Sequence, residues 1–264
     1  MRPALHIVKV GGNVIDDEAR LDSFLHGFAR LNGGRMLVHG GGKLATRMAG
    51  DLGIPQKMID GRRVTDADTL RIVTMVYAGE VNKNIVAKLH SMGCPSLGLC
   101  GADGDIIRAH RRKHPTIDYG FVGDVDRVDA GRIGSILGTG LSIVVAPITH
   151  DGHGQLLNTN ADTIAQEVAK AMSAEYEVTL LYCFEKPGVL LDAEDEGSVL
   201  SHIGPALLTR LKEEKRIFAG MIPKLDNAMA ALQSGVRRVV IGQAEDWDGL
   251  VSGTKGTVIS LNDP

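Results

Sequence analysis

The sequence has few cysteines, no long apolar run and no large excess of positive or negative charge. The 264 residues include three cysteines, an odd number that cannot all pair with one another. All three lie in or beside apolar runs without metal or redox spacing, so we expect reduced thiols and a cytoplasmic protein. No apolar run approaches the roughly 18 residues of a membrane-spanning helix, and the first run is too short for a signal peptide. We therefore expect no membrane partner.

The formal net charge is only −3, so no overall basic field exists to hold a nucleic acid. The one dense basic run, Arg108–His114, is of the kind that usually faces solvent. With 44% hydrophobic residues, the chain can bury the core of one large domain or of two lobes.

Short apolar runs alternate with longer segments of helical period along the chain. Several runs are apolar almost throughout, which is typical of strands covered by helices on both faces. The pattern predicts an α/β fold with a mostly parallel sheet. The predicted strands are Leu5–Val10, Met36–His39, Ser96–Cys100, Ser142–Ala146, Val178–Cys183, Arg238–Ile241 and Thr257–Ser260. The predicted helices are Glu18–Leu31, Lys43–Leu52, Ala67–Met92, Ala161–Met172, Pro205–Lys215 and Pro223–Ser234.

Local signals mark where some of these elements begin and end. Thr65 and Asp68 have the spacing of a capping box, which predicts that Thr65 caps the third helix. Residues 101–130 are polar and glycine-rich without helical period, and we expect hairpins or a flap there. Helix ends are predicted at Gly53, Gly93 and Gly235.

A lysine, Lys9, lies inside the first apolar strand and is followed by Gly11 and Gly12. Buried lysines are rare unless they are paired. A strand-end lysine before a glycine turn can place its ammonium group beside converging backbone N–H groups, which is how phosphate sites are built. The alternative is an edge-strand lysine whose ammonium group reaches solvent.

Three consecutive glycines, 40–42, follow the second strand and open a helix. Glycine loses the most backbone freedom on folding, so three together indicate that something approaches the backbone closely. The spacing fits neither a Walker P-loop nor a dinucleotide fingerprint, and the next strand does not end in an acid. We favour a backbone anion site at the helix N-terminus over a plain tight turn.

Five other polar residues have both a functional and an ordinary explanation. Arg62 and Arg63 could bind a carboxylate with an arginine fork, or both could face solvent. Asn160 could be a helix cap and Asp162 a first-turn acid. Lys224 lies in the first turn of a helix, where a cation is unfavourable unless an anion binds there.

In their order along the chain, these motifs resemble the amino-acid kinase family. The matching motifs are KVGG, VHGGG, GRRVT, NKNIV, GFVGDV, LNTNAD, FEKPGVL, GMIPK and the closing GT. The resemblance runs from Leu5 to about Ile259 and is strongest for members that phosphorylate acylglutamates. It implies a three-layer αβα sandwich around a central, mostly parallel sheet. It also implies one domain over 1–264, with an acylglutamate-binding half (1–175) and a nucleotide-binding half (176–264).

The reaction implied by the resemblance is phosphorylation of the γ-carboxylate of N-acetylglutamate by ATP, a step of arginine biosynthesis. Mg²⁺ is expected on the ATP phosphates, with no metal held by the protein alone. The implied catalytic residues are Lys9 and Lys224, which neutralise the phosphoryl group, and Asp162, which holds both lysines. Backbone donors are implied at Gly11, Gly12 and Gly41, and acylglutamate contacts at Gly41, Gly42, Arg63 and Asn158. The implied nucleotide contacts are Glu185, Lys186, Gly188, Val189, Leu190, Arg216, Ile217 and Phe218.

Several features leave alternatives open. Many relatives have Asp at the position of Glu185 and a small residue at that of Lys186. Only four residues precede Leu5, whereas arginine-inhibited relatives carry an extra N-terminal helix, so we expect an unregulated homodimer. Other readings are a carbamate or glutamate kinase, a non-catalytic acylamino-acid or nucleotide sensor, and a dinucleotide oxidoreductase. N-succinylglutamate is an alternative substrate because Arg108, Arg111, Arg112 and Lys113 concentrate cations in the expected flap.

Overall fold

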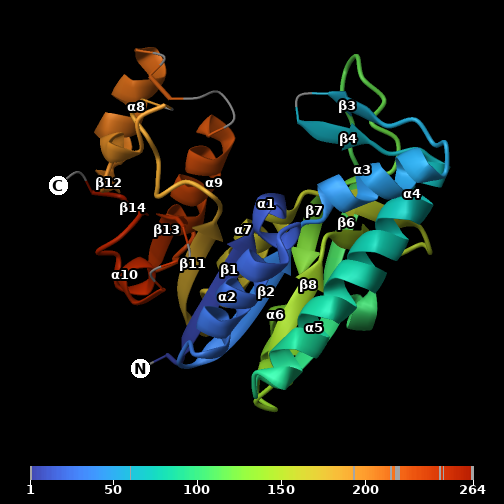
Figure 1. Cartoon of the computed structure of the whole chain (residues 1–264), viewed down its shortest axis with the longest axis horizontal. Helices are drawn as coiled ribbons and strands as arrows, with labels where there is room; N and C mark the ends of the chain where they lie inside the picture. The colour runs from blue at the N-terminus through green and yellow to red at the C-terminus, as the bar shows by residue number, and fades with distance from the viewer. Residues whose placement is uncertain are drawn as a thin grey trace.

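A mostly parallel eight-stranded sheet forms the centre of the molecule (Figure 1). The computed structural model describes residues 2–59, 61–192, 194–214, 216–217, 221–243, 245 and 247–262. The strand order is β12-β14-β13-β11-β1-β2-β8-β5, and of these neighbours only β13 and β14 pair antiparallel. The strands are β1 (Ala4–Val10), β2 (Gly34–His39), β5 (Ser96–Cys100), β8 (Ser142–Ala146), β11 (Glu177–Cys183), β12 (His202–Ile203), β13 (Arg238–Gly242) and β14 (Thr257–Ile259).

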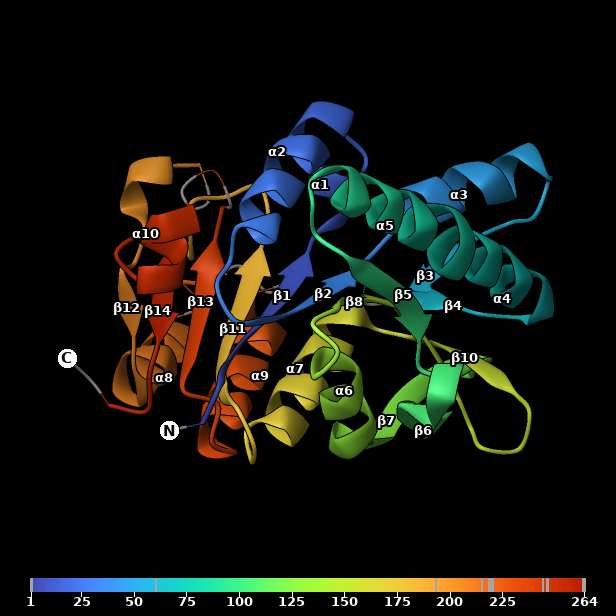
Figure 2. The ribbon, with the colours of Figure 1, turned by 90° about the horizontal axis from the view of Figure 1, so that it is seen from below.

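Helices cover both faces of this sheet, as Figure 2 shows from below. In β1, Leu5 and Ile7 point into one core with the helix α7, whereas Val8 and Val10 point into the other core with α2. A strand buried on both faces has to be apolar almost throughout, which explains the continuous runs in the sequence. On the α7 side lie α6 (Ala130–Leu137), α7 (Ala161–Met172), α8 (Pro205–Glu213) and α9 (Ile222–Gln233). On the other side lie α1 (Gly12–Ile15), α2 (Glu18–Ala29), α3 (Gly42–Asp51), α4 (Ala67–Val73), α5 (Asn82–Ser91) and α10 (Trp247–Ser252).

A glycine in α2, Gly27, allows the C-terminal helix α10 to pack closely against α2. Glycine inside a helix is destabilising by about 0.5–1 kcal/mol relative to alanine. At Gly27, however, a Cβ would lie only 1.9 Å from the indole ring of Trp247. That ring packs beside Phe24, with the ring centroids 5.1 Å apart. Gly27 therefore leaves the space in which α10 docks on α2.

The predicted strands and helices are all present, with boundaries that differ by no more than two residues where they can be compared. The predicted helix over 67–92 contains an unexpected π-helical segment, η1 (Thr74–Val81), between α4 and α5. Such wide turns are frequent at functional sites, and Tyr77 of this segment lines a cavity described below. The predicted helix ends have left-handed backbone, with φ of 69° at Gly53, 71° at Gly93 and 99° at Gly235.

The predicted Thr65 cap is wrong. Asp66 caps α4, and its carboxylate accepts a hydrogen bond of 2.8 Å from the Thr69 N–H. Thr65 is instead buried and bridges to Gly120. The tertiary contact decides between two adjacent residues that can both cap a helix.

Residues 101–130 form part of a small closed barrel. The predicted hairpin is confirmed, since β6 (Ile107–Arg111) pairs antiparallel with β7 (Val122–Val128). The short strands β9 (Ile148–His150) and β10 (Leu156–Thr159) complete the barrel. A separate two-stranded hairpin, β3 (Lys57–Ile59) and β4 (Arg62–Val64), follows α3. Two 3-10 turns, η2 (Asp103–Asp105) and η3 (Glu196–Ser198), complete the list of elements.

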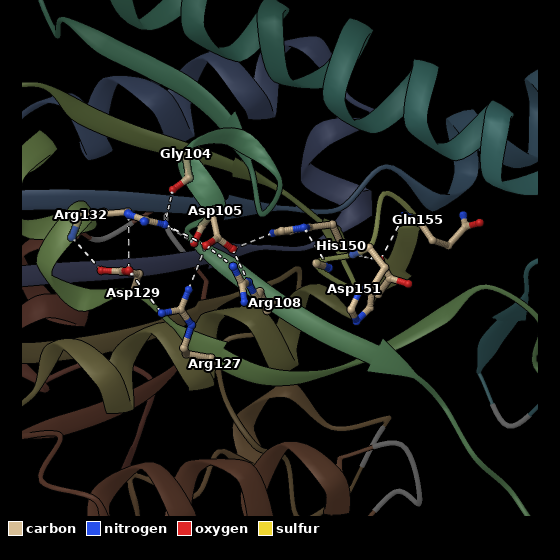
Figure 3. A network of polar contacts seen from close by, with 11 residues as sticks. Gly104, Asp105, Arg108, Arg127, Asp129, Arg132, His150, Asp151 and Gln155 are labelled. Carbon is tan, nitrogen blue, oxygen red and sulfur yellow. Dashed lines mark hydrogen bonds and ion pairs between the residues drawn. The ribbon is translucent and has the colours of Figure 1, made fainter.

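An aspartate, Asp105, anchors the barrel to its surroundings (Figure 3). Its carboxylate oxygens lie 2.6 Å from Arg108 Nε, and 3.0 Å from both Arg127 Nη2 and Arg132 Nη1. His150 Nε2 lies 3.0 Å away as well. The hydrogen bond from Arg108 and the neighbouring cations hold the pKa of Asp105 far below its ordinary value. One carboxylate thus connects η2, β6, β7, α6 and β9.

None of the described helices is both long and apolar enough to cross a bilayer.

The Asp66 cap can be tested by substitution. We expect Asp66→Ala to lower the free energy of unfolding by about 1 kcal/mol, because the first turn of α4 loses a cap. Chemical denaturation would measure the change. Asp68→Ala, an exposed first-turn control without a cap bond, should have a clearly smaller effect. Equal losses in the two variants would contradict the assignment of the cap.

Candidate active site

Three adjoining hollows form one groove over the carboxyl ends of the central strands. Their volumes are about 800, 500 and 210 Å³. Phe184, Glu185 and Lys224 line both the first and the second hollow. Glycines 40–42 and Arg63 line both the second and the third. The middle hollow therefore connects a large cavity on the C-terminal side to a small one on the N-terminal side.

An ion pair, Lys9 with Asp162, lies at the middle of the groove. Lys9 continues the alternation of Leu5 and Ile7 in β1, so its side chain points to the face covered by α7. Asp162 is in the first turn of α7, and its Oδ1 lies 2.8 Å from Lys9 Nζ. The two side chains are only 13% and 18% exposed. Because β1 lies between β11 and β2, the alternative of an edge-strand lysine is wrong.

A second lysine, Lys224, comes from the first turn of α9 and faces the same carboxylate. Its Nζ lies 5.3 Å from the centre of the Phe184 ring, within the range of a cation–π contact. Burial lowers the pKa of Lys224, the charge of Asp162 opposes this, and the charge of Lys9 adds to it, so the net pKa is below its ordinary value. Burial raises the pKa of Asp162, but the charges of Lys9 and Lys224 bring it below its ordinary value. Lys9 thus forms an ion pair with Asp162, and Lys224 is near enough to be affected by the same charge, which leaves an excess of positive charge in the groove.

The glycine turns differ in the backbone donors that they offer. The Gly11 N–H donates to the Cys183 carbonyl at 3.0 Å, so it is occupied within the fold. Within the described residues, neither the Gly12 N–H nor the Gly41 N–H has an acceptor, as is usual for residues that open a helix. Gly41 has φ of 148°, and a Cβ there would lie 2.9 Å from the ring of Tyr77. The close approach that the sequence indicated is therefore made in part by a side chain of the π-helical segment.

The predicted substrate residues Arg63 and Asn158 line the small third hollow together with Gly41 and Gly42. Arg63 is 9% exposed, and its Nη2 donates to the Gly42 carbonyl at 2.8 Å and to Thr46 Oγ1 at 2.9 Å. Asn158 Nδ2 donates to Thr65 Oγ1 at 3.0 Å. Both side chains are therefore held in place at the wall of the cavity.

Arg63 has supporting residues that the sequence analysis missed. Its Nη1 donates to Gln56 Oε1, and Tyr77 lies close enough to interact with its guanidinium group. Thr46 lies one helical turn after Gly42, a spacing that could have indicated its position beside the glycine turn. No local pattern marks Gln56 or Tyr77.

The neighbouring arginine, Arg62, also lines the third hollow. Its side chain is half-buried, and within the described part of the chain it makes no hydrogen bond or ion pair. Burial and the nearby charge of Arg112 lower the pKa of Arg62, while Asp124 raises it. The resemblance implied a substrate contact for Arg63 alone, and in the structure Arg62 lines the same hollow.

Three of the four basic residues considered for the acyl group are already paired, and the fourth, Lys113, is exposed. Arg111 Nη2 lies 2.9 Å from Asp118 Oδ1, and Arg112 forms an ion pair with Asp124. Arg108 pairs with Asp105 as described above. The argument for an acyl-group carboxylate from these three cations was therefore wrong, because aspartates of the same region neutralise them.

The predicted nucleotide residues gather around the cavity of about 800 Å³. Its lining includes Glu185, Lys186, Gly188, Val189, Leu190, Arg216 and Ile217, whereas Phe218 lies outside the described residues. Val189 N–H donates to Thr257 Oγ1 at 2.8 Å, which ties this turn to β14. At Gly188 a Cβ would lie 2.7 Å from the same hydroxyl oxygen, so the turn requires glycine.

No group of three or more His, Cys, Asp or Glu side chains is placed to hold a metal ion within the described ranges.

A family model described as "Amino acid kinase family" matches residues 4–243. The chain belongs to the amino acid kinase family. Among members of this family, it is 53% identical to "Acetylglutamate kinase" of Bacteroides fragilis over 241 residues, covering 91% of this chain and 92% of that protein. It is 52% identical to "Acetylglutamate kinase" of Cytophaga hutchinsonii over 261 residues, covering 98% of this chain and 99% of that protein.

Solved structures agree with the amino acid kinase fold. A Streptococcus mutans UA159 protein superposes with a TM-score of 0.80 and 28% identity, covering 98% of this chain and 99% of that one. An N-acetylglutamate synthase from Neisseria gonorrhoeae, solved with coenzyme A and N-acetyl-glutamate, superposes with a TM-score of 0.82 and 21% identity. This chain covers 60% of that longer protein, and the likeness supports the fold alone.

The charge arrangement in the groove predicts the effect of removing its carboxylate. We expect Asp162→Asn to lower kcat by about 10²-fold, because the two lysines lose the charge that holds them together, an effect on the scale of one preorganised electrostatic group. Steady-state kinetics would measure it, with circular dichroism to check folding. Glu167→Gln is the matched control, since Glu167 lies in the same helix and pairs with Lys170 at 3.0 Å. A variant at Asp162 that unfolds but retains its rate per folded molecule would show that Asp162 is only structural.

Proposed function

We propose that this protein phosphorylates the γ-carboxylate of N-acetylglutamate with ATP, a step of arginine biosynthesis. One observation carries the proposal: the groove joins a nucleotide-sized cavity to the Arg63–Asn158 cavity, with Lys9 and Lys224 at the junction. The relatives named acetylglutamate kinase support the same activity over nearly the whole chain.

The groove suits the charges of this reaction. A γ-carboxylate oxygen attacks the γ-phosphorus of ATP, the bond to the β–γ bridging oxygen breaks, and the products are an acyl phosphate and ADP. Both reactants are anions, so the protein contributes mainly positioning and charge neutralisation. Lys9 and Lys224 supply positive charge, and the Gly12 and Gly41 N–H groups supply hydrogen-bond donors for the phosphoryl oxygens. Asp162 holds the two lysines at the point of transfer.

Magnesium fits this site as a companion of the nucleotide. Apart from the Glu185 carboxylate, the wall at the junction offers mainly ammonium groups and N–H donors, which suit phosphate oxygens better than a bare cation. When bound to the ATP phosphates, Mg²⁺ would neutralise part of their charge. Of the nearby carboxylates, Asp162 is already paired with Lys9, and Glu185 lines both the middle and the nucleotide-sized hollow.

The proposal divides the chain as the sequence suggested. Residues 1–175 contribute the cavity with Arg63 and Asn158, and residues 176–264 contribute most of the nucleotide-sized cavity. We also infer a homodimer that acts in the cytoplasm. Analytical ultracentrifugation would test the homodimer, because a monomer would sediment at the chain mass of 28.1 kDa.

Substrate specificity is tested by coupling ADP release to a spectrophotometric assay with N-acetylglutamate, glutamate and carbamate in turn. We expect turnover with N-acetylglutamate only. Turnover with carbamate or glutamate would assign the protein to another branch of the family. Tight binding of N-acetylglutamate or ATP without turnover would indicate a sensor.

The proposed role of Arg63 predicts a selective loss. We expect Arg63→Ala to raise the KM for N-acetylglutamate at least about tenfold, because a charge-assisted pair contributes more than a neutral hydrogen bond. The Kd for ATP, measured by calorimetry, should stay within twofold. Lys57→Ala, an exposed cation of the same hairpin, is the control and should change neither value. An equal loss of ATP affinity would contradict the role of Arg63.

The acyl group is tested by the ratio of kcat/KM for N-acetylglutamate and N-succinylglutamate. We expect a ratio of at least about tenfold in favour of acetyl. The acetyl group is neutral and needs no cation, whereas the arginines considered for a succinyl carboxylate are already paired. The succinyl alternative keeps one observation in its favour, the half-buried Arg62 at the wall of the third hollow. A ratio in favour of succinyl that is abolished in Arg62→Ala would establish that alternative.

A further inference from the structure

A chain of hydrogen bonds connects the last strand of the sheet to the glycine turn at the groove. Lys83 Nζ lies 2.8 Å from the Gly98 carbonyl of β5 and 3.0 Å from Asn82 Oδ1. Asn82 Nδ2 lies 3.1 Å from His39 Nε2. His39 Nδ1 lies 2.8 Å from the carbonyl of Gly40. Asn82 and His39 are both completely buried, so the contact between them is made out of water, whereas Lys83 is exposed.

The direction of each of these hydrogen bonds follows from the groups that can only donate or only accept. Lys83 can only donate, so it faces the oxygen of the Asn82 amide. The Val144 carbonyl, 3.0 Å from Asn82 Nδ2, can only accept, so it faces the amide nitrogen. That nitrogen has a second hydrogen, which it donates to His39 Nε2. Because Nε2 accepts, the proton of the neutral imidazole is on Nδ1, where it is donated to the Gly40 carbonyl.

The surroundings keep His39 neutral. Burial lowers the pKa of His39 to about 4, the nearby charge of Lys83 lowers it as well, and the bond to the Gly40 carbonyl opposes them. At neutral pH the ring therefore has one donor and one acceptor, and both are used.

Glycine at position 98 makes room for this arrangement. A Cβ at Gly98 would lie 2.1 Å from Asn82 Oδ1 and 2.9 Å from Lys83 Nζ. Any larger residue at position 98 would displace the Asn82 amide.

The consequence for the groove lies in the peptide between Gly40 and Gly41. A trans peptide is planar, so its carbonyl and its N–H point in opposite directions. His39 holds the Gly40 carbonyl, and within the described residues the Gly41 N–H has no acceptor. Gly41 lines both the middle and the third hollow.

We propose that His39 and Asn82 are positioning residues for phosphoryl transfer, which hold the Gly40 carbonyl so that the Gly41 N–H points into the groove toward the phosphoryl oxygens. This inference rests on the proposed kinase function. Neither side chain lines any of the three hollows, so both act through the backbone of the glycine turn. An ordinary buried histidine would also be hydrogen-bonded, but its loss would lower stability without a selective effect on kcat.

The first experiment uses the unmodified protein. Two-dimensional NMR of the ¹⁵N-labelled histidine rings at pH 7, assigned with a His39 variant, reports which ring nitrogen carries the proton. We expect His39 as the neutral Nδ1–H tautomer. The Nε2–H tautomer or an imidazolium would overturn the proposal, because neither fits a donor at Nδ1 together with an acceptor at Nε2.

The second experiment compares variants by kcat and KM. We expect His39→Leu to lower kcat by about 10²-fold, the scale for loss of one oxyanion-type donor, with the KM for ATP and N-acetylglutamate within threefold. His39→Asn should recover at least about tenfold of this loss, because its amide nitrogen can occupy the position of Nδ1. His6→Leu is the matched control. His6 lies near the start of β1, whereas His39 ends the neighbouring strand β2, so the kcat of the His6 variant should not change.

Thermal unfolding of each variant separates folding from catalysis. A folded His39→Leu with the kcat of the unmodified protein, or a folded His39→Asn no better than His39→Leu, would overturn the proposal. If the leucine variant does not fold, the asparagine variant and the tautomer still decide. An unmodified protein that turns over no acylglutamate would contradict the proposed function, whereas an active protein with unaffected His39 variants would contradict only this inference.

Discussion

The ion pair between Lys9 and Asp162 is the constraint around which the site is organised. Burying a single charge is very unfavourable, so each of these groups depends on the other. The pair lies where the end of a central strand meets the start of a helix, and that position follows from the alternation of β1 and the first turn of α7. Lys224 adds a second positive charge from the other half of the chain. The excess positive charge is what makes the groove suited to two anionic substrates.

Backbone N–H groups add hydrogen-bond donors to the positive charge of the lysines. Two glycine turns follow β1 and β2, which are neighbours in the sheet, so the starts of α1 and α3 lie side by side at the groove. Backbone N–H groups have a fixed direction only if the peptide itself is held. Gly11 is held through its N–H by Cys183, and Gly40 is held through its carbonyl by His39. Buried polar contacts behind the groove thus set the direction of donors at its surface.

The small barrel shows why the density of charge in a sequence is a poor guide to binding. Its arginines are numerous, but aspartates from neighbouring strands and turns pair with them. Asp105 alone contacts three guanidinium groups. Arg62 and Arg63, which lie outside the dense basic run, are instead the cations that line the third hollow.

Much of this molecule could be predicted from the sequence by itself. The apolar runs predicted the central strands and the helical periods predicted the helices. A strand that is buried on both faces must be apolar almost throughout, and this can be recognised in the sequence. The order of the motifs indicated the family, and it singled out Lys9, Asp162 and Lys224, which lie close enough to affect one another's charge in the structure. The helix ends at Gly53, Gly93 and Gly235 could be predicted in the same way, because a glycine with left-handed backbone is a local signal.

Only the tertiary structure decided which partner each polar group takes. Asp66 caps α4 because Thr65 is drawn into a bridge with Gly120. The arginines of β6 find their aspartates through strand register and turn geometry, and the sequence shows neither. The supports of Arg63, the π-helical position of Tyr77 and the link from Gly98 to His39 join residues that are far apart in the chain. Periodicity depends on near neighbours along the chain, whereas hydrogen-bond partners depend on the packing of whole elements, and that packing exists only once the chain has folded.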